Sequence, residues 1–126
     1  MKALSVNQPF AHAIIHGSKR IENRTWLTEY RGPLLIHASK EKAWFKAEAK
    51  RLGLDPATVI HGALIGVVDL LDVLPLAKVR RDEWAEGPWC WVVQNPRAIQ
   101  PVKWRGARGL FTVRRGLEQF TLLRDF

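Results

Sequence analysis

The segment Gly62-Ala-Leu-Ile-Gly-Val-Val-Asp-Leu-Leu-Asp-Val73 decides the fold expected for this chain. It is too apolar to alternate between a buried and an exposed face, so we expect a strand that is buried on both faces. Its two glycines predict a bend or a close approach of another backbone segment. Asp69 and Asp72 interrupt the apolar run. Each is a structural partner of a basic residue, half of an acid–base pair, or exposed at the strand end.

Shorter elements are expected on both sides of this strand. Helices are predicted over Pro9–His16, with Gly17 as the stop signal, over Lys40–Leu52, with Ser39 as the N-cap, and over Pro75–Glu86. Further strands are predicted over Met1–Val6, Lys19–Trp26, Leu34–Ala38, Trp89–Gln94, Ile99–Trp104 and Leu110–Val113. Strands and helices do not alternate regularly, which favours an α+β fold with a strongly bent sheet or a small barrel.

Length and composition limit the classes of protein that the chain can be. With 126 residues, 47% apolar and 25% charged, residues 1–126 are expected to form one globular domain rather than a disordered, fibrous or membrane-spanning chain. The single Cys90 cannot form an internal disulfide, and no signal peptide is evident, so we expect a cytoplasmic protein. His12 and His16 are spaced as on one helical turn but lack a third ligand, so neither a metal nor another cofactor is predicted.

Charge points to a polyanionic partner. Twenty Lys and Arg against twelve Asp and Glu give a net charge of +8, which favours nucleic acid. The segment from Gly87 to Leu117 holds no acidic residue, and its basic and aromatic side chains are Arg97, Lys103, Arg105, Arg108, Arg114 and Arg115 with Trp89, Trp91, Trp104 and Phe111. Either this segment follows a nucleic-acid strand, or its aromatic residues face the core and its arginines face water. Trp89, Trp91 and Val93 share strand parity and are predicted to be core.

The segment Lys19–Trp26 allows two interpretations. Period-two alternation places Arg20, Glu22, Arg24 and Trp26 on one face, opposite Ile21, Asn23 and Thr25. That charged face is either a solvated exterior with cross-strand ion pairs or the wall of a cleft that binds a base or a phosphate. The helical stripe of Lys42, Lys46 and Lys50 is expected to be solvated only.

Three segments together resemble the ASCH domain family, named for activating signal cointegrator-1 homology. They are Leu4-Ser-Val-Asn-Gln-Pro-Phe-Ala11, Gly17-Ser-Lys-Arg-Ile-Glu-Asn-Arg-Thr-Trp26 and Arg31-Gly-Pro-Leu-Leu-Ile-His-Ala38. The strand Gly62–Asp69 and the closing segment Trp91–Gly109 resemble later motifs of the same family, in the same order. The resemblance therefore covers nearly the whole chain.

This resemblance implies a PUA-like fold, a small and mostly antiparallel β-barrel with flanking helices and a cleft beside the first helix. It also implies binding of RNA or a modified nucleotide. Carried onto this chain, the binding residues expected from the resemblance and from the basic segment are Gln8, Pro9, Phe10, Lys19, Glu22, Arg24, Trp26, His37, Asp69, Lys103, Arg105 and Arg108. His37 is either a hydrogen-bonded residue at the rim or a general base.

Some relatives in the family are enzymes, so a small hydrolase is the alternative. The resemblance to N4-acetylcytidine amidohydrolases matches Lys19 to their lysine, whereas Glu22 stands where they have threonine. If the chain is an enzyme, Lys19 and Glu22 are the catalytic candidates, and ribonuclease activity is a further possibility that the family suggests. A protein-binding adaptor that uses the tryptophan-rich surface is a third class, which no motif supports.

Overall fold

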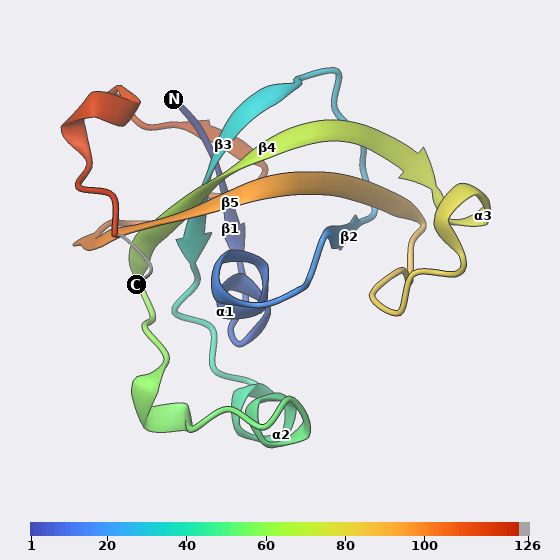
Figure 1. The fold of residues 1–126 in the computed structure, drawn as a ribbon, viewed down its shortest axis with the longest axis horizontal. Helices are drawn as coiled ribbons and strands as arrows, with labels where there is room; N and C mark the ends of the chain where they lie inside the picture. The colour runs from blue at the N-terminus through green and yellow to red at the C-terminus, as the bar shows by residue number, and fades with distance from the viewer. Residues whose placement is uncertain (124–126) are drawn as a thin grey trace.

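Six strands form one curled sheet in the computed structural model, which describes residues 1–123 (Figure 1). The strands are β1 (Lys2–Val6), β2 (Ile21–Arg24), β3 (Gly32–Ala38), β4 (Ala63–Pro75), β5 (Trp89–Lys103) and β6 (Leu110–Thr112). Their order across the sheet is β2-β5-β4-β3-β1-β6. Only β1 and β3 pair in parallel, and the other neighbours are antiparallel. The fold is α+β with a half-barrel sheet, as predicted.

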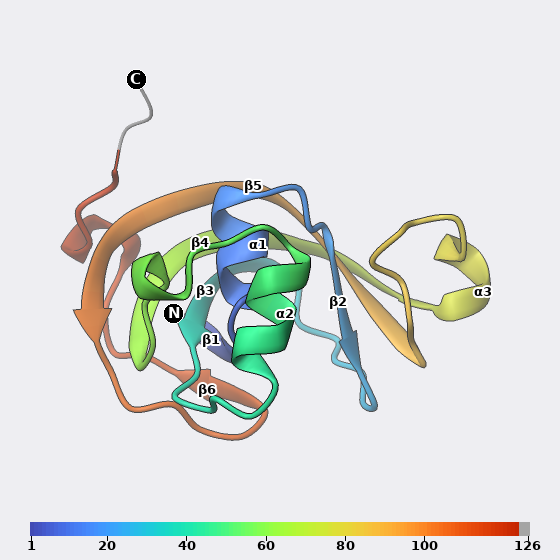
Figure 2. The same cartoon turned by 90° about the horizontal axis from the view of Figure 1, so that it is seen from below.

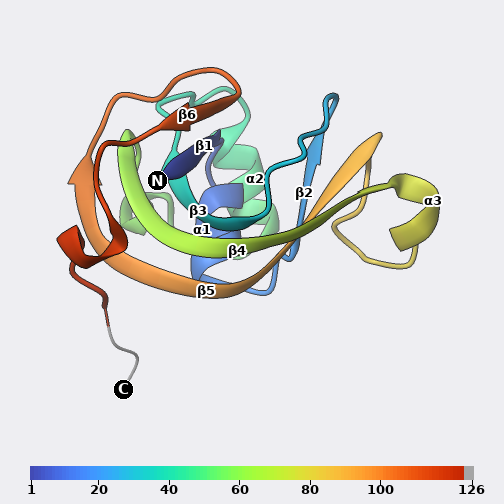
Figure 3. The same cartoon turned by 90° about the horizontal axis from the view of Figure 1, so that it is seen from above.

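The two longest strands, β4 and β5, give the sheet its curvature and arc around β1 and β3 (Figures 2 and 3). Their pairing shifts register at three places, and each such bulge bends a strand and increases its twist. Gly66 lies at the first of them. A Cβ at Gly66 would stand 2.5 Å from Ile15 Cδ1 and 2.8 Å from the Arg97 carbonyl oxygen. The predicted close approach at this glycine is therefore confirmed.

One continuous strand, β5, replaces the two strands predicted over Trp89–Gln94 and Ile99–Trp104. Asn95 and Pro96 were expected to form a turn, because proline has no amide hydrogen for a sheet ladder. In the structure the pair lies in a bulge, between the partners Gln94 and Arg97, where no ladder bond is required. Asn95 adopts a left-handed backbone with φ of 54°, and the strand continues.

The helices are short, and two of them differ from prediction. Helix α1 (Phe10–His16) ends at Gly17 as expected, α2 is confined to Phe45–Arg51, and α3 to Leu76–Val79. Pro56–Thr58 and Leu117–Gln119 form single 3₁₀ turns. No helix within residues 1–123 has the length and apolar character needed to cross a membrane.

The late start of α2 has a local cause. The Ser39 hydroxyl accepts a hydrogen bond from the Glu41 amide, and the Glu41 carboxylate accepts one from the Ala43 amide. Such side-chain bonds compete with a helical backbone. Trp44 then adopts a left-handed conformation, with φ of 66°, directly before the helix.

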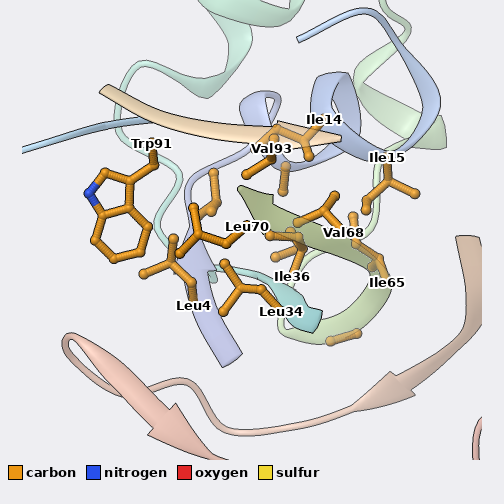
Figure 4. Packing of buried hydrophobic residues seen from close by; sticks show 14 residues of the cluster. Leu4, Ile14, Ile15, Leu34, Ile36, Ile65, Val68, Leu70, Trp91 and Val93 are labelled. Atoms are coloured by element: carbon orange, nitrogen blue, oxygen red, sulfur yellow. The ribbon is translucent and has the colours of Figure 1, made fainter. Parts of the chain in front are cut away.

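The sheet is apolar on both faces. On one face, α1 packs over Leu4, Leu34, Ile36, Val68, Leu70, Trp91 and Val93 (Figure 4). On the other face, Ala3, Leu35, Leu64, Val67 and Ile99 pack against Val113 and Phe120 of the C-terminal segment. The prediction that Trp91 and Val93 are core is confirmed, and Trp89 packs partly buried against the first cluster.

Candidate functional site

A cavity of about 380 Å³ lies where the end of β1, the start of α1 and strand β2 meet. We call it the Lys19 pocket. Its lining residues are Ser5, Val6, Asn7, Phe10, Lys19, Glu22, Asn23, Arg24, Arg51, Glu83, Trp84 and Glu86. Four of the predicted site residues are therefore brought together here, namely Phe10, Lys19, Glu22 and Arg24.

Lys19 is the buried cation of this pocket, with only 3% of its surface exposed. Its Nζ lies 3.8 Å from Glu22 Oε1 and sits over the rings of Phe10 and Trp84, 5.5 and 5.0 Å from their centroids. Burial is the largest cause that lowers the pKa of Lys19, and together with the Arg24 charge it outweighs the stabilisation of the ammonium by Glu22, Glu86 and Asp82. The Lys19 ammonium therefore loses its proton more readily than that of a surface lysine.

Arg24 fixes the other side of the Glu22 carboxylate. Arg24 Nε donates to Glu22 Oε2 at 3.0 Å, and Nη2 lies 2.9 Å from the same oxygen. Nη2 also donates to the backbone carbonyl of Ser5 at 2.6 Å. Arg24 thereby ties the edge strand β2 to the end of β1, and the carboxylate is held between two cations in a defined orientation.

The pocket as a whole is close to electrically neutral. Its lining contains three cations, Lys19, Arg24 and Arg51, and three carboxylates, Glu22, Glu83 and Glu86. Donors and acceptors are thus both available, beside the faces of Phe10 and Trp84. The indole Nε1 of Trp84 is buried and has no hydrogen-bond partner within residues 1–123. This combination suits a polar, aromatic and uncharged group better than a bare anion.

Asn23 is a pocket residue that sequence reasoning missed. Its Oδ1 accepts hydrogen bonds from the amides of Glu86 and Gly87, and its Nδ2 donates to the Trp84 carbonyl at 2.9 Å. Asn23 therefore holds the loop that supplies Trp84 and Glu86 to the pocket. No local pattern links residue 23 to residues 84–87, because the contact depends on β2 pairing with β5.

A second cavity, of about 620 Å³, lies at the other side of the β1 end, and we call it the basic hollow. Its lining residues are Ser5, His37, Ser39, Lys40, Lys103, Trp104, Arg105, Gly106, Ala107 and Arg108. The lining has four cations and no carboxylate. His37, Lys103, Arg105 and Arg108, all predicted from sequence, therefore lie together here, apart from the Lys19 pocket.

His37 anchors the loop that carries these cations. The ring is 2% exposed, with Nδ1 3.0 Å from the Ser5 hydroxyl and Nε2 2.7 Å from the Trp104 carbonyl oxygen. A carbonyl only accepts, so Nε2 carries the proton and, in the neutral ring, the Ser5 hydroxyl donates to Nδ1. Gly106 packs against this pair, since a Cβ there would meet Ser5 Oγ at 2.6 Å. His37 is thus a positioning residue of the basic hollow.

Ser5 is common to both cavities. Its carbonyl accepts from Arg24 in the Lys19 pocket, and its hydroxyl contacts His37 in the basic hollow. The two cavities are therefore neighbours that meet at a single residue of β1.

Four predicted site residues line neither of these cavities, namely Gln8, Pro9, Trp26 and Asp69. Gln8 is buried, where its Nε2 donates to the Ile60 carbonyl and its Oε1 accepts from the His12 amide, and buried Pro9 precedes α1. Trp26 packs edge-on against Trp91, with ring centroids 4.8 Å apart.

Asp69 accepts hydrogen bonds from Arg97 at 3.0 Å and Asn95 at 3.1 Å. Asp72 pairs with Arg31. Both aspartates are thus structural partners of basic residues, one of the interpretations left open above. Strand geometry thus distributes the predicted binding residues among two cavities, the core and the outer part of the sheet.

Metal-binding geometry is not found in the described part of the chain. His12 and His16 stack with ring centroids 4.8 Å apart, but residues 1–123 contain no cluster of three His, Cys, Asp or Glu side chains able to hold an ion. Burial and the nearby His16 charge lower the pKa of His12.

Comparisons with known proteins identify relatives. The model of the ASCH domain matches residues 4–103. Activating signal cointegrator 1 of Homo sapiens is 32% identical over 111 residues, and that of Mus musculus 38% over 111 residues, each alignment covering 76% of this chain. The match spans 19% of the length of these relatives. The crystal structure of ASCH from Zymomonas mobilis superposes with a TM-score of 0.62 at 14% identity, covering 90% of this chain and 87% of that one.

Proposed function

This chain belongs to the ASCH domain family, and from that premise we propose that the chain binds single-stranded RNA or a nucleotide across the two cavities that meet at Ser5. The family is PUA-like and is associated with RNA binding. The observation that carries the proposal is the contrast in charge between the neighbouring cavities, one nearly neutral and aromatic, the other purely cationic.

In this proposal the Lys19 pocket takes an unpaired base. The ring of Phe10 or Trp84 supplies an aromatic face for stacking, which is how single-stranded bases are commonly held. The Glu22 carboxylate accepts from an exocyclic amine of the base, and Lys19 donates to a carbonyl edge. Trp84, rather than Trp26, is the tryptophan that supplies this face, because Trp26 packs against Trp91 and does not line the pocket.

The basic hollow takes the phosphates that flank that base. Lys40, Lys103, Arg105 and Arg108 surround it without an opposing carboxylate, and phosphate contacts of this kind supply sequence-independent affinity. If a base lies in one cavity and its phosphate in the other, the sugar between them lies near Ser5.

Fluorescence anisotropy with a labelled single-stranded RNA tests the two roles separately. Replacing both Arg105 and Arg108 by alanine should weaken binding to all sequences alike, whereas Arg114→Ala, an exposed arginine of the same segment that lines neither cavity, should leave it unchanged. Phe10→Ala should weaken binding by about 5- to 150-fold, the range for one lost stack. Equal effects of the double variant and of Arg114→Ala would contradict the assignment of phosphates to the basic hollow.

A hydrolase acting in the Lys19 pocket is the second candidate, and the lowered pKa of Lys19 favours it. A lysine that loses its proton more readily can act as a general base toward water or attack an acyl carbon itself. Glu22, fixed by Arg24, would orient that amine. The substrate class would be an N4-acylated cytidine, whose base the pocket would hold by the same contacts.

Hydrolysis of N4-acetylcytidine and of short RNA should be measured for the wild type, Lys19→Ala and Lys19→Arg. An enzyme that uses neutral Lys19 should lose activity in both variants, because arginine stays protonated. If the wild type turns over neither substrate while RNA binding is intact, the hydrolase candidate is rejected and the binding function stands.

A further inference from the structure

An exposed tryptophan beside the basic hollow is not used by either cavity of the proposed site. Trp44 is 83% exposed, more than any of the other large apolar side chains on the surface of residues 1–123. It lines a separate apolar hollow of about 540 Å³ together with Lys42, Phe45, Lys46, Pro56 and His61, among others. A single exposed apolar side chain is common on protein surfaces, but this one borders an apolar hollow, and such a hollow is a candidate contact surface.

Packed, buried side chains form one side of that hollow. Phe45 is 6% exposed and contacts the ring of His61 edge-on, with centroids 4.6 Å apart. Phe45 also forms a small buried cluster with Ala49 and Val59, which holds α2 against the segment around Pro56. Because Phe45 is packed in this cluster, the backbone of Trp44, the residue directly before it, is held next to the cluster.

The segment that carries Trp44 begins at the basic hollow. Ser39 and Lys40 line the basic hollow, and Lys42, Trp44 and Lys46 line the apolar one. Ser39 and Lys40 thus lie beside the loop between β5 and β6, because the same hollow is lined by Arg105 and Arg108. Lys40 and Trp44 are four residues apart, so their Cα atoms are at most about 14 Å from each other.

Cations outnumber carboxylates along this path, in which Glu41 is the one acidic residue between Ser39 and Trp44. Lys40, Lys103, Arg105 and Arg108 line the first cavity and Lys42 and Lys46 the second, while no aspartate or glutamate lines either one within residues 1–123. Glu41 lies in the connecting segment, but its carboxylate accepts from the Ala43 amide. An aromatic face flanked by cations and joined to a phosphate-binding surface is the arrangement that single-stranded nucleic acid favours.

We infer that Trp44 is a second base-stacking position, which holds a nucleotide of the same single-stranded RNA outside the Lys19 pocket and the basic hollow. This inference rests on the proposed function. The RNA would run from the basic hollow past Lys40 and Lys42. One of its bases would stack on the indole of Trp44, over the apolar hollow. Lys46 would contact the phosphate beside that base.

A series of RNA lengths tests this inference. Binding of a mononucleotide and of a single-stranded RNA of about 12 nucleotides, within the range that one small binding domain covers, is measured for the wild type, Trp44→Ala, Trp44→Phe and Leu71→Ala. Leu71 is a matched control, because it is exposed and apolar but lies on β4. Trp44→Ala should weaken binding of the long RNA by about 5- to 150-fold and leave mononucleotide binding unchanged, while Trp44→Phe retains most of the affinity.

The outcomes separate this inference from the proposed function. If the wild type binds neither RNA, the proposed function fails, and the inference fails with it. If the wild type binds both and Trp44→Ala behaves like Leu71→Ala, the inference alone is overturned. It is also overturned if Trp44→Ala changes the sedimentation of the free protein but not its RNA affinity, since Trp44 would then cover a second copy of the chain.

Discussion

Asn23 shows how a single uncharged side chain can determine the shape of the candidate site. Three hydrogen bonds join its amide to the backbone of residues 84, 86 and 87, and these residues carry the Trp84 and Glu86 walls of the Lys19 pocket. These three bonds connect the loop to β2.

We therefore expect Asn23→Ala to weaken ligand binding more than it weakens the fold. The variant leaves two backbone amides and one carbonyl without their partner, and because these groups are exposed or only partly buried, water replaces part of the loss and the cost is about 1 kcal/mol. The loop can instead move toward water, and then Trp84 leaves the pocket. Anisotropy with single-stranded RNA and urea unfolding on the same samples separate these effects, and equal losses in both would contradict the positioning role.

Asp69 makes a pH-dependent contribution to stability that can be measured. Burial alone would raise the pKa of Asp69, but hydrogen bonds from Asn95 and Arg97 and the Arg97 charge lower it below its ordinary value. A carboxyl with a lowered folded-state pKa stabilises the fold above its unfolded pKa, and that stability is lost as the pH falls through the folded pKa.

Asp69→Asn should accordingly lower the free energy of unfolding at neutral pH by about 1 kcal/mol or less, since the pair is partly exposed, and the difference should shrink in acid. Urea unfolding between neutral and acidic pH provides the measurement. Asp72→Asn is the control, because the Asp72 side chain is 52% exposed and its pair with Arg31 is 3.3 Å long. A difference from wild type that does not depend on pH would rule out the ionic origin.

At the scale of elements, the contact between α1 and the sheet depends on the absence of a side chain at Gly66. A Cβ there would stand too close to Ile15 of α1 and to the Arg97 carbonyl of β5, and a backbone carbonyl cannot move aside as a side chain can. Gly66→Ala should destabilise the protein by about 1–3 kcal/mol through overpacking. Thermal unfolding measures this, with Gly53→Ala as a comparison.

Gly53 is informative because nothing lies within 4 Å of the Cβ it would gain, although its φ is +72°. Its variant reports the cost of a left-handed alanine without crowding. If Gly66→Ala loses no stability, crowding at Gly66 is contradicted.

The elements also show which features local sequence determines. The apolar run Gly62–Val73 predicted the central strand β4 correctly, because burial on both faces leaves little alternative. Helix α2 was predicted to begin at Lys40, whereas side-chain bonds from Ser39 and Glu41 delay it to Phe45. The break predicted at Asn95-Pro96 was wrong because a bulge against β4, which local sequence does not record, accommodates both residues.

The candidate site was predictable to the extent that its residues are neighbours in sequence. Lys19, Glu22 and Arg24 lie within one strand and its approach, and the structure places them in one cavity with Phe10. Trp84 and Asn23 were missed because their contact joins segments about 60 residues apart. The neighbours of His37 could not be predicted from local sequence, since the β5–β6 loop reaches it only after the sheet has curled.

At the scale of the whole molecule, part of the net charge of +8 lies in one cavity, where an anion could bind. Four cations line the basic hollow without a carboxylate, whereas the Lys19 pocket is balanced. The affinity for single-stranded RNA should therefore fall as salt rises, through release of the ions condensed on the phosphates.

The slope of log affinity against log salt should distinguish the cavities. Each phosphate contact removed from the basic hollow, by Arg105→Ala or Arg108→Ala, should reduce the slope by about 0.7. Phe10→Ala should lower the affinity at every salt concentration without changing the slope, because stacking releases no counterions. A slope that responds to Phe10→Ala as it does to Arg105→Ala would contradict the division between a base pocket and a phosphate hollow.

Ser5 joins the two cavities structurally. Its carbonyl accepts from Arg24 and its hydroxyl contacts His37, so a ligand that moved Ser5 in one cavity would change the free energy of binding in the other. Such an effect is reciprocal by necessity. A ligand that spans Ser5 also binds its second group intramolecularly, at a high effective concentration. The protein should consequently distinguish a nucleotide from an equimolar mixture of nucleoside and phosphate, although the chemical groups are the same.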